Sequence, residues 1–252
     1  MRNVRLIARL DIKGKNLIKG IRLEGLRVLG NPYEFAKKYF DEGIDEILYM
    51  DTVASLYNRN SLNNIVAETS KNIFIPITVG GGIRSIEDAT QALKSGADKI
   101  AINTAAVNNP GLVKELCNRF GSSTIVISIE AKKLNNAKWE VYTNNGREAT
   151  GLDVINWATQ CEKLGAGEIL LTSVDQEGTG QGFDYNLIDQ VSKKTNIPVI
   201  ASGGMGSLND FLKVVTESNC EAVAIADILH YKKKNIDEIK NFAKKNSITV
   251  RI

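Results

Sequence analysis

Short apolar runs alternate along the chain with stretches whose apolar residues have helical spacing. Eight such runs have the length of strands, and they lie at 6–11, 46–51, 75–80, 99–103, 124–130, 168–174, 197–203 and 222–227. Several helical patterns, such as 31–43, 85–96 and 153–165, begin with Asn, Ser or Asp and end at Gly, as capped helices do. Eight strand–helix units in series predict an α/β protein with a closed parallel (β/α)8 barrel, a TIM barrel. A length of 252 residues is usual for one such barrel, so we expect a single domain over 1–252.

An internal repeat supports this prediction. The motif EIL at Glu46 recurs 122 residues later at Glu168, and IPITVGGG from Ile75 is echoed 122 residues later by IPVIASGG from Ile197. Asp11 in the motif DIK corresponds to Glu130 in the motif EAK, at a shift of 119. We therefore expect two half-barrels, about 1–120 and 121–252, with Asp11 and Glu130 facing each other across a pseudo-twofold axis. The insertion at 133–151 interrupts the pattern, and its alternation KWEVYT and turn NNG predict a small hairpin.

Bulk properties exclude several classes of protein. The formal charge is +3, and the lysines scatter over expected helix faces, which argues against a nucleic-acid surface. No apolar run approaches the roughly 20 residues of a membrane helix, and the N-terminal apolar run contains a charge, unlike a signal peptide. We therefore expect a cytoplasmic protein that binds neither membrane nor nucleic acid.

Metal and cofactor chemistry has little support in the sequence. The three cysteines, Cys117, Cys161 and Cys220, are far apart and fit neither a metal motif nor a redox pair. His230 is the sole histidine, so a histidine-based triad or a multi-histidine metal site is nearly excluded. We expect no metal and no cofactor, and the chemistry then falls to carboxylates, lysines and backbone amides.

Carboxylates stand at the ends of the expected strands, where a barrel of this kind builds its active site. Asp51 and Asp175 are equally well explained as functional groups and as caps of the loops that follow. Asp11 and Glu130 stand at the ends of apolar runs on opposite sides of the expected barrel. A pair of carboxyl groups flanking one cavity can act as general acid and base when their environments separate the two pKa values.

Two glycine-rich segments, GGGIRS at 80–85 and GGMGS at 203–207, each join an expected strand to a helix. Without side chains, backbone N–H groups and a helix N-terminus can approach an anion, most plausibly phosphate. Each motif alone is a weak signal, because glycine also makes tight turns. Two copies related by the repeat predict phosphate sites at opposite rims of one mouth, spanned by a molecule with a phosphate at each end.

A second group of charges begins the strands, at the opposite end of the barrel. This group consists of Arg5, Glu46, Lys99 and Glu168. Charge at strand starts usually serves stability, so the residues alone favour a salt-bridged plug.

Long motifs in the chain resemble the cyclase subunit of imidazole glycerol phosphate synthase, the HisF family. The resemblance spans essentially the whole chain and is carried by LDIKGKNLIKG, TVGGGIRS, DKIAINTAAV, GAGEILLTSVDQEGTGQGFD and IPVIASGGMG. It implies a glutaminase partner on the bottom face, in a heterodimer, whose ammonia crosses the barrel core to the top. There the ammonia reacts with a bis-phosphorylated ribulosyl substrate, giving imidazole glycerol phosphate and an aminoimidazole carboxamide ribotide in histidine biosynthesis.

The resemblance also assigns roles to individual residues. Asp11 and the acid at position 130 become the acid/base pair, and Lys19 belongs to a mobile first loop. Arg5, Glu46, Lys99 and Glu168 match the gate to the ammonia passage, and a salt-bridged plug is how a closed gate would look. The resemblance implies that Gly82, Asn103 and Thr104 hold one phosphate. From the glycine segments and the strand-end positions we further expect substrate or phosphate contacts at Gly81, Asp175, Gly178, Gly203, Gly204 and Asp227.

Departures from the family pattern cluster at the mouth. Glu130 replaces an Asp, and a shift of about 1 Å in a reacting group can cost on the order of 100-fold in rate. Glu177 replaces the Asp before Gly178, and Asp227 replaces a small hydroxyl residue near the second phosphate. A carboxylate at 227 either repels a phosphate in a partly desolvated mouth or points away and caps the loop before His230.

Two alternatives to the cyclase follow from these departures. In the first, the chain is a paralog that supplies ammonia for converting an acetamido group of a surface-polysaccharide sugar into an acetamidino group, with a sugar amidotransferase as a further partner. In the second, the barrel is a non-catalytic ammonia conduit that activates the glutaminase while a third protein does the chemistry. A kept bottom face with an altered mouth fits both alternatives.

Overall fold

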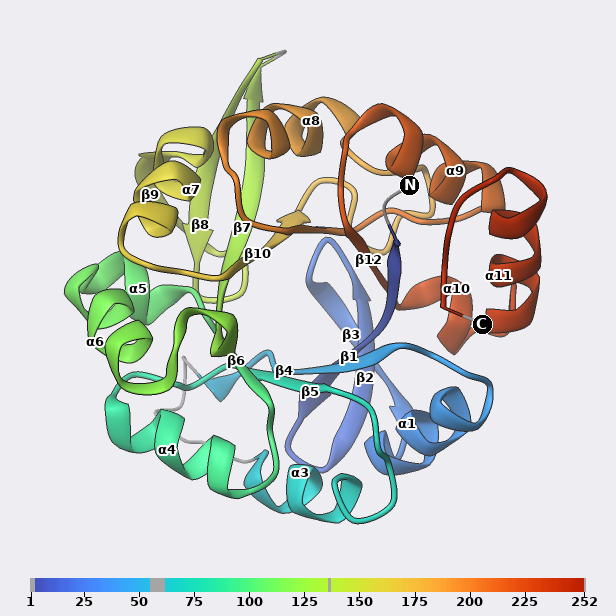
Figure 1. The fold of residues 1–252 in the computed structure, drawn as a ribbon, viewed down its shortest axis with the longest axis horizontal. Coiled ribbons are helices and arrows are strands. Elements are labelled where there is room, and N and C mark those ends of the chain that lie inside the picture. Colours follow the sequence, from blue (N-terminus) through green and yellow to red (C-terminus); the bar gives the residue numbers. More distant parts are fainter. Residues whose placement is uncertain (1–2, 55–61, 136, 252) are drawn as a thin grey trace.

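Eight parallel strands close into a barrel in the computed structural model, which describes residues 3–54, 62–135 and 137–251 (Figure 1). Each strand pairs in parallel with its neighbours, and the last pairs with the first, which confirms the predicted (β/α)8 barrel. In ring order the strands are β1 (Arg5–Lys13), β4 (Glu46–Asp51), β5 (Ile77–Gly80), β6 (Lys99–Ile102), β7 (Ile125–Asn135), β10 (Glu168–Ser173), β11 (Val199–Ser202) and β12 (Ala222–Ile225). Strand β7 therefore lies opposite β1.

The strands form where both faces of an apolar run can be buried, as parallel sheets require. Every residue of β4, β5, β10, β11 and β12 is buried. Alternate side chains point outward to the helices or inward to the axis. The inward apolar side chains form one cluster that fills the barrel interior: Ile7, Leu48, Met50, Ala101, Val126, Leu170, Ile200, Ala222 and Ala224.

Helices surround the barrel at the positions that the periodicity predicts. The longer ones are α1 (Pro32–Asp41), α3 (Asn63–Thr69), α4 (Ile86–Lys94), α6 (Gly111–Phe120), α7 (Val154–Lys163), α8 (Tyr185–Lys194), α9 (Leu208–Glu217) and α11 (Ile236–Lys245). Two short helices, α5 (Thr104–Asn108) and α10 (Asp227–His230), follow β6 and β12, and a 3₁₀ turn, η1 (Ser122–Thr124), precedes β7. The expected caps form at Asn31, Ser85 and Asp153, whose side chains accept a backbone N–H. Asp184, Ser207 and Asn235 cap three further helices in the same way. None of the helices in the described part of the chain is long and apolar enough to cross a bilayer.

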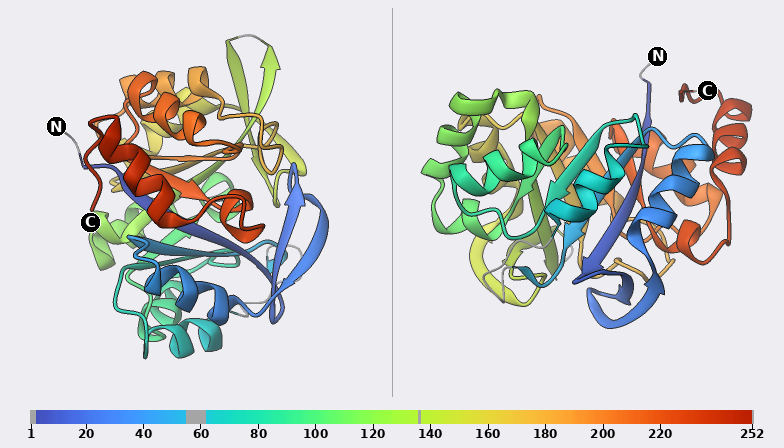
Figure 2. Two further views of the ribbon diagram at one scale, coloured as in Figure 1. Left: turned by 90° about the vertical axis from the view of Figure 1, so that its right-hand side faces the viewer. Right: turned by 90° about the horizontal axis from the view of Figure 1, so that it is seen from below.

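Two antiparallel excursions leave the barrel after β1 and after β7. The predicted hairpin is β8 (Lys138–Thr143) with β9 (Glu148–Asp153), and it extends β7 into a three-stranded sheet. The first excursion, β2 (Asn16–Ile21) with β3 (Glu24–Gly30), pairs back onto β1. Its two-residue turn has positive φ at Arg22 and Leu23, the geometry that matches the twist of a hairpin. Figure 2 shows both excursions at the end of the barrel opposite the two termini, and this end is the mouth.

Candidate functional site

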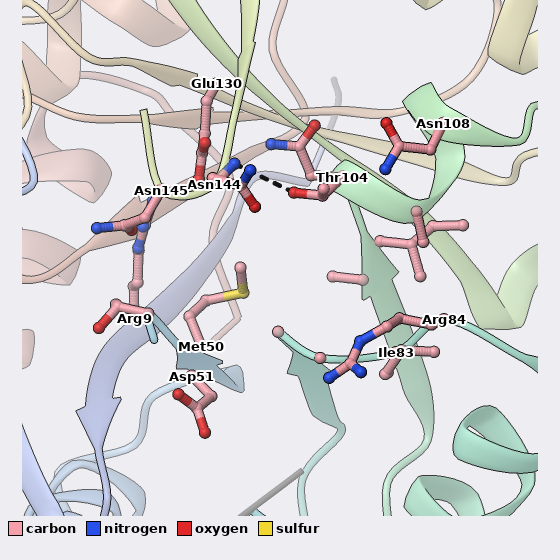
Figure 3. Close-up of a pocket in the computed structure, with 17 residues that line it drawn as sticks. Arg9, Met50, Asp51, Ile83, Arg84, Thr104, Asn108, Glu130, Asn144 and Asn145 are labelled. Atoms are coloured by element: carbon pink, nitrogen blue, oxygen red, sulfur yellow. Dashed lines mark hydrogen bonds between the residues drawn. The ribbon is translucent and has the colours of Figure 1, made fainter. Parts of the chain in front are cut away.

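Two cavities open between the carboxyl ends of the strands. The first, of about 280 Å³, brings together five of the predicted site residues: Gly81, Gly82, Asn103, Thr104 and Glu130. The second, of about 20 Å³, collects Gly178, Gly203, Gly204 and Asp227. Arg9 lines both. In Figure 3, Arg9, Glu130 and Asn145 lie along one side of the first cavity, and Arg84 and Asn108 lie along the other.

Glycine is needed in the loop that follows β5. Gly81 has φ +92°, and a Cβ there would lie 2.2 Å from the carbonyl oxygen of Asp51. The loop leads into α4, and Arg84 of this loop lines the cavity. On the facing wall, the Thr104 hydroxyl accepts the Asn144 N–H at 3.1 Å and the Asn103 side-chain amide donates to the Tyr142 carbonyl at 3.0 Å. The excursion after β7 therefore fixes the side chains that line this cavity.

The second glycine loop packs backbone against backbone. A Cβ on Gly204 would lie 2.0 Å from the Gly182 carbonyl oxygen, and Gly182 N–H donates to the Gly204 carbonyl at 2.8 Å. A Cβ on Gly206 would likewise meet the Gly180 carbonyl at 2.1 Å. Close packing thus explains these glycines without an anion. The space left holds about one water molecule, so the two cavities differ strongly in capacity.

Asp227 begins α10 and lines the second cavity. Its Oδ1 lies 2.5 Å from Lys233 Nζ, so a cation compensates its charge. Lys233 thereby weakens the repulsion that a lone carboxylate would exert on an anion. Glu177 is buried and lines the same cavity.

The predicted acid/base pair has two different environments. Asp11 Oδ1 accepts the Arg9 Nε–H at 2.9 Å, and Lys19 Nζ lies 4.0 Å from Oδ2. Glu130 Oε2 accepts a backbone N–H from Gly146 at 2.7 Å. Burial alone would raise the pKa of Asp11, but Arg9 and then Lys19 hold it below its ordinary value. Burial raises the pKa of Glu130 to about 7, against the opposing effects of the Gly146 N–H and Arg9.

Lys19 lies on β2, and its side chain is buried, in ion-pair contact with Glu177. Its pKa is raised, because Glu177 and then Asp11 outweigh the lowering effect of burial. The first excursion is also held by its turn, where the Arg22 N–H donates to the Glu177 carbonyl at 2.7 Å. The predicted first loop is therefore a hairpin folded onto the mouth.

Asp175 lies outside both cavities. Its Oδ2 accepts the Lys133 N–H at 2.8 Å, and its carbonyl accepts the Arg22 Nε–H at 3.3 Å. These contacts tie the loop after β10 to both excursions. Asp51 lines the first cavity, and its Oδ1 also accepts the Val53 N–H at 3.0 Å, as a loop cap would.

Arg9 was missed from the sequence. It is buried inside the barrel, and Nη1 donates to Thr172 Oγ1 at 2.8 Å and to Ser202 Oγ at 3.0 Å. The signal was a charge within the apolar run of strand one, two residues before Asp11. Strand alternation puts residues 9 and 11 on the same face, so the pair could have been inferred.

The four charges at the strand starts meet at the end opposite the mouth. Arg5 pairs with Glu46 at 2.6 Å and with Glu168, and Lys99 pairs with Glu168 at 2.9 Å and with Glu46 at 3.7 Å. The inner apolar cluster separates this ring from Arg9. Within the described ranges, no group of three His, Cys, Asp or Glu residues could hold a metal ion.

Comparison with known proteins gives a consistent set of relatives. Residues 5–235 match the model of a family described as histidine biosynthesis protein. The chain is 65% identical over 211 residues to imidazole glycerol phosphate synthase subunit HisF of Legionella pneumophila, which covers 84% of this chain and all of the relative. The protein of the same name from Pyrococcus furiosus is 49% identical over 98% of each chain. That from Prochlorococcus marinus is 47% identical over 98% of this chain and 97% of its own.

Proposed function

The chain belongs to the histidine biosynthesis protein family, and we propose that it is the HisF-type cyclase subunit of an imidazole glycerol phosphate synthase. In this role it uses ammonia from a glutaminase partner to convert a bis-phosphorylated ribulosyl substrate into imidazole glycerol phosphate and an aminoimidazole carboxamide ribotide. One observation of the structure carries the proposal: Asp11 and Glu130 stand on opposite strands of one mouth, in environments that move their pKa values in opposite directions.

The protonation states assign the two roles. Near neutral pH Asp11 is ionised and can accept a proton, whereas a substantial part of Glu130 retains its proton and can donate it. Lys19 stabilises negative charge beside Asp11, and its buried pairing with Glu177 keeps it at the mouth. The longer side chain at 130 is accommodated because the turn of the second excursion supplies Gly146 as its partner.

The first cavity is the proposed phosphate site. Gly81 and Gly82 leave their backbone open to an anion, Asn103 and Thr104 supply polar groups, and Arg84 supplies a positive charge. The second phosphate needs more room than the second cavity offers, so the loops around Gly178 and Gly204 must separate on binding. Lys233 provides the positive charge at that end.

The glutaminase is proposed to dock at the end opposite the mouth, beside the ring of Arg5, Glu46, Lys99 and Glu168. An open hollow of about 460 Å³ lies there and includes Arg5, Lys99 and Glu168 in its lining. In this proposal the ion pairs of the ring bar the axis of the barrel, and ammonia enters when one of them opens. We propose that docking of the partner opens it.

One observation favours a second candidate, the paralog that serves sugar amidination. The second cavity is lined by two carboxylates, Glu177 and Asp227. Carboxylate oxygens accept hydrogen bonds from sugar hydroxyls, whereas a phosphate dianion has no proton to donate to them. A non-catalytic conduit has no comparable support, because Asp11 and Glu130 keep the asymmetry of an acid and a base.

Purified barrel with saturating ammonium salt and the bis-phosphorylated ribulosyl substrate tests the cyclase proposal. We expect substrate loss and formation of both products, abolished by Asp11→Asn and unaffected by Asp189→Asn, which removes a carboxylate from a surface ion pair on α8. Absence of turnover by the wild type and by Glu130→Asp would contradict the cyclase. Activity that appears only in Glu130→Asp with Asp227→Ser would show that the mouth is specialised for another ligand.

A further inference from the structure

Arg9 is a buried arginine at the point where the barrel interior meets the mouth. Its neighbours Ala8 and Leu10 belong to the outer core, so Arg9 shares the inward face of β1 with Ile7 and Asp11. The residue is 3% exposed. Because it lines both cavities, its charge acts on whatever occupies either of them. Figure 3 shows its side chain at the first cavity.

Three strands hold the guanidinium in place. Nε donates to Asp11 on its own strand, and Nη1 donates to Thr172 on β10 and to Ser202 on β11. A guanidinium stays protonated at any ordinary pH, and Asp11, Glu177 and Glu130 raise the pKa of Arg9 further, against the lowering effect of burial. The barrel therefore carries a fixed, permanent cation beside its acid pair.

This cation is shared unequally between the two carboxyl groups. Asp11 receives a hydrogen bond from it and has Lys19 as a second cation 4.0 Å away. Glu130 receives a backbone N–H from Gly146, and among the described residues it has no ion pair. The same charge thus acts by direct contact on Asp11 and at longer range on Glu130.

Three other ionisable groups lie near Asp11 and Glu130, and Arg9 remains the main source of the different charge environments of these two carboxyl groups. Lys19 is engaged by Glu177. His230 stays neutral near pH 7, because burial and then Lys19 lower its pKa to about 4. Asp51, at the end of the neighbouring strand β4, also accepts the Val53 N–H.

We propose that Arg9 is a positioning residue that divides the two mouth carboxyl groups, holding Asp11 ionised as proton acceptor and leaving Glu130 as proton carrier. In one turnover Glu130 gives its proton to the ligand and Asp11 takes one from it, so the ligand gains and loses equally. Asp11 then releases its proton to water and Glu130 takes one from water, which restores both carboxyl groups. The use of these protons rests on the proposed function. The division itself exists in the free protein and can be measured without substrate.

Carboxyl ¹³C NMR titration of the intact, ligand-free barrel tests the division, with Asp11→Asn and Glu130→Gln assigning the two resonances. In the wild type we expect Glu130 to titrate near pH 7 and Asp11 below its ordinary range. Arg9→Met removes the charge, and the midpoint of Asp11 should rise by about one to three pH units. Arg9→Lys should restore most of the low midpoint. Thr172→Val is the matched control, because it removes an anchor and keeps the charge, and Asp11 should stay low.

A residue that merely fills the core would change stability and leave the titration alone. An Asp11 midpoint that is unchanged in folded Arg9→Met overturns the proposal. If Arg9→Met fails to fold, Arg9→Gln gives the same comparison, and equal midpoints for Asp11 and Glu130 in the wild type overturn the proposal without any variant. A barrel that shows the predicted titrations and no turnover contradicts the cyclase function and leaves the role of Arg9 standing.

Discussion

Replacing Glu130 by glutamine should stabilise the folded barrel at alkaline pH and much less at acidic pH. Glu130 is buried, and its pKa rises from 4.5 to about 7 on folding. A carboxyl group whose pKa is raised in the folded state favours folding below the unfolded pKa, and this advantage is lost as the pH rises through the folded value. The rise corresponds to roughly 3 kcal/mol against folding above pH 8, at about 1.4 kcal/mol per pH unit. Near pH 5.5 the cost is about 1 kcal/mol by the same reasoning.

Glutamine has nearly the same shape and keeps an oxygen that can accept the Gly146 N–H, and it carries no charge. Urea unfolding at pH 5.5 and at pH 8.5 should therefore show a stability difference from wild type that grows by on the order of 2 kcal/mol between the two values. Glu34→Gln, at an exposed position of α1, is the control and should show no such growth.

A constant difference between the two pH values would refute the reasoning. It would mean that Glu130 is already ionised in the folded protein at pH 5.5, so that Arg9 and the Gly146 N–H outweigh burial. A glutamine variant that becomes relatively less stable at pH 8.5 would show that the ionised carboxylate strengthens the fold.

Three further outcomes are expected. Gly204→Ala places a Cβ 2.0 Å from a backbone carbonyl oxygen at φ +108°. It should therefore destabilise the barrel by more than about 2 kcal/mol in urea unfolding. Gly14→Ala is the control, because open space surrounds Gly14, and it should cost about 1 kcal/mol. Lys99→Met removes one cation of the ring. It should leave ammonium-dependent turnover within about twofold of wild type and change glutamine-dependent turnover at least tenfold. Equal effects on the two activities would contradict the proposed gate. His230 has a pKa of about 4, so its contribution to stability is present above pH 6.5 and is lost as the pH falls toward 4; His230→Phe should flatten this acid limb in thermal melts.

The barrel and its caps were predictable because each rests on local pattern. A run such as EILYMD at 46–51 has no polar residue between its ends, so only burial on both faces suits it. Ser85 and Asp153 mark helix starts because their side chains accept backbone N–H groups that no helix can satisfy itself. The opposition of Asp11 and Glu130 also follows from chain order, since strands four places apart in a ring of eight face each other.

The environment of the site was not predictable from the same patterns. The resemblance placed Lys19 in a mobile first loop, and its side chain is buried because the first excursion folds back across the mouth onto Glu177. The two glycine loops look alike in sequence. One borders a cavity of about 280 Å³, and the other packs against the 180–182 backbone and leaves about 20 Å³.

The sequence by itself determined the eight-unit barrel, the family and the placement of two acids at the ends of opposite strands, because strand period and chain order are local properties. Only the tertiary structure decided which of the two acids is ionised near neutral pH. A pKa depends on burial and on charges that the fold brings within a few ångströms. Arg9 lies beside Asp11 with anchors 163 and 193 residues away, and Glu130 lies beneath a turn that offers one backbone N–H.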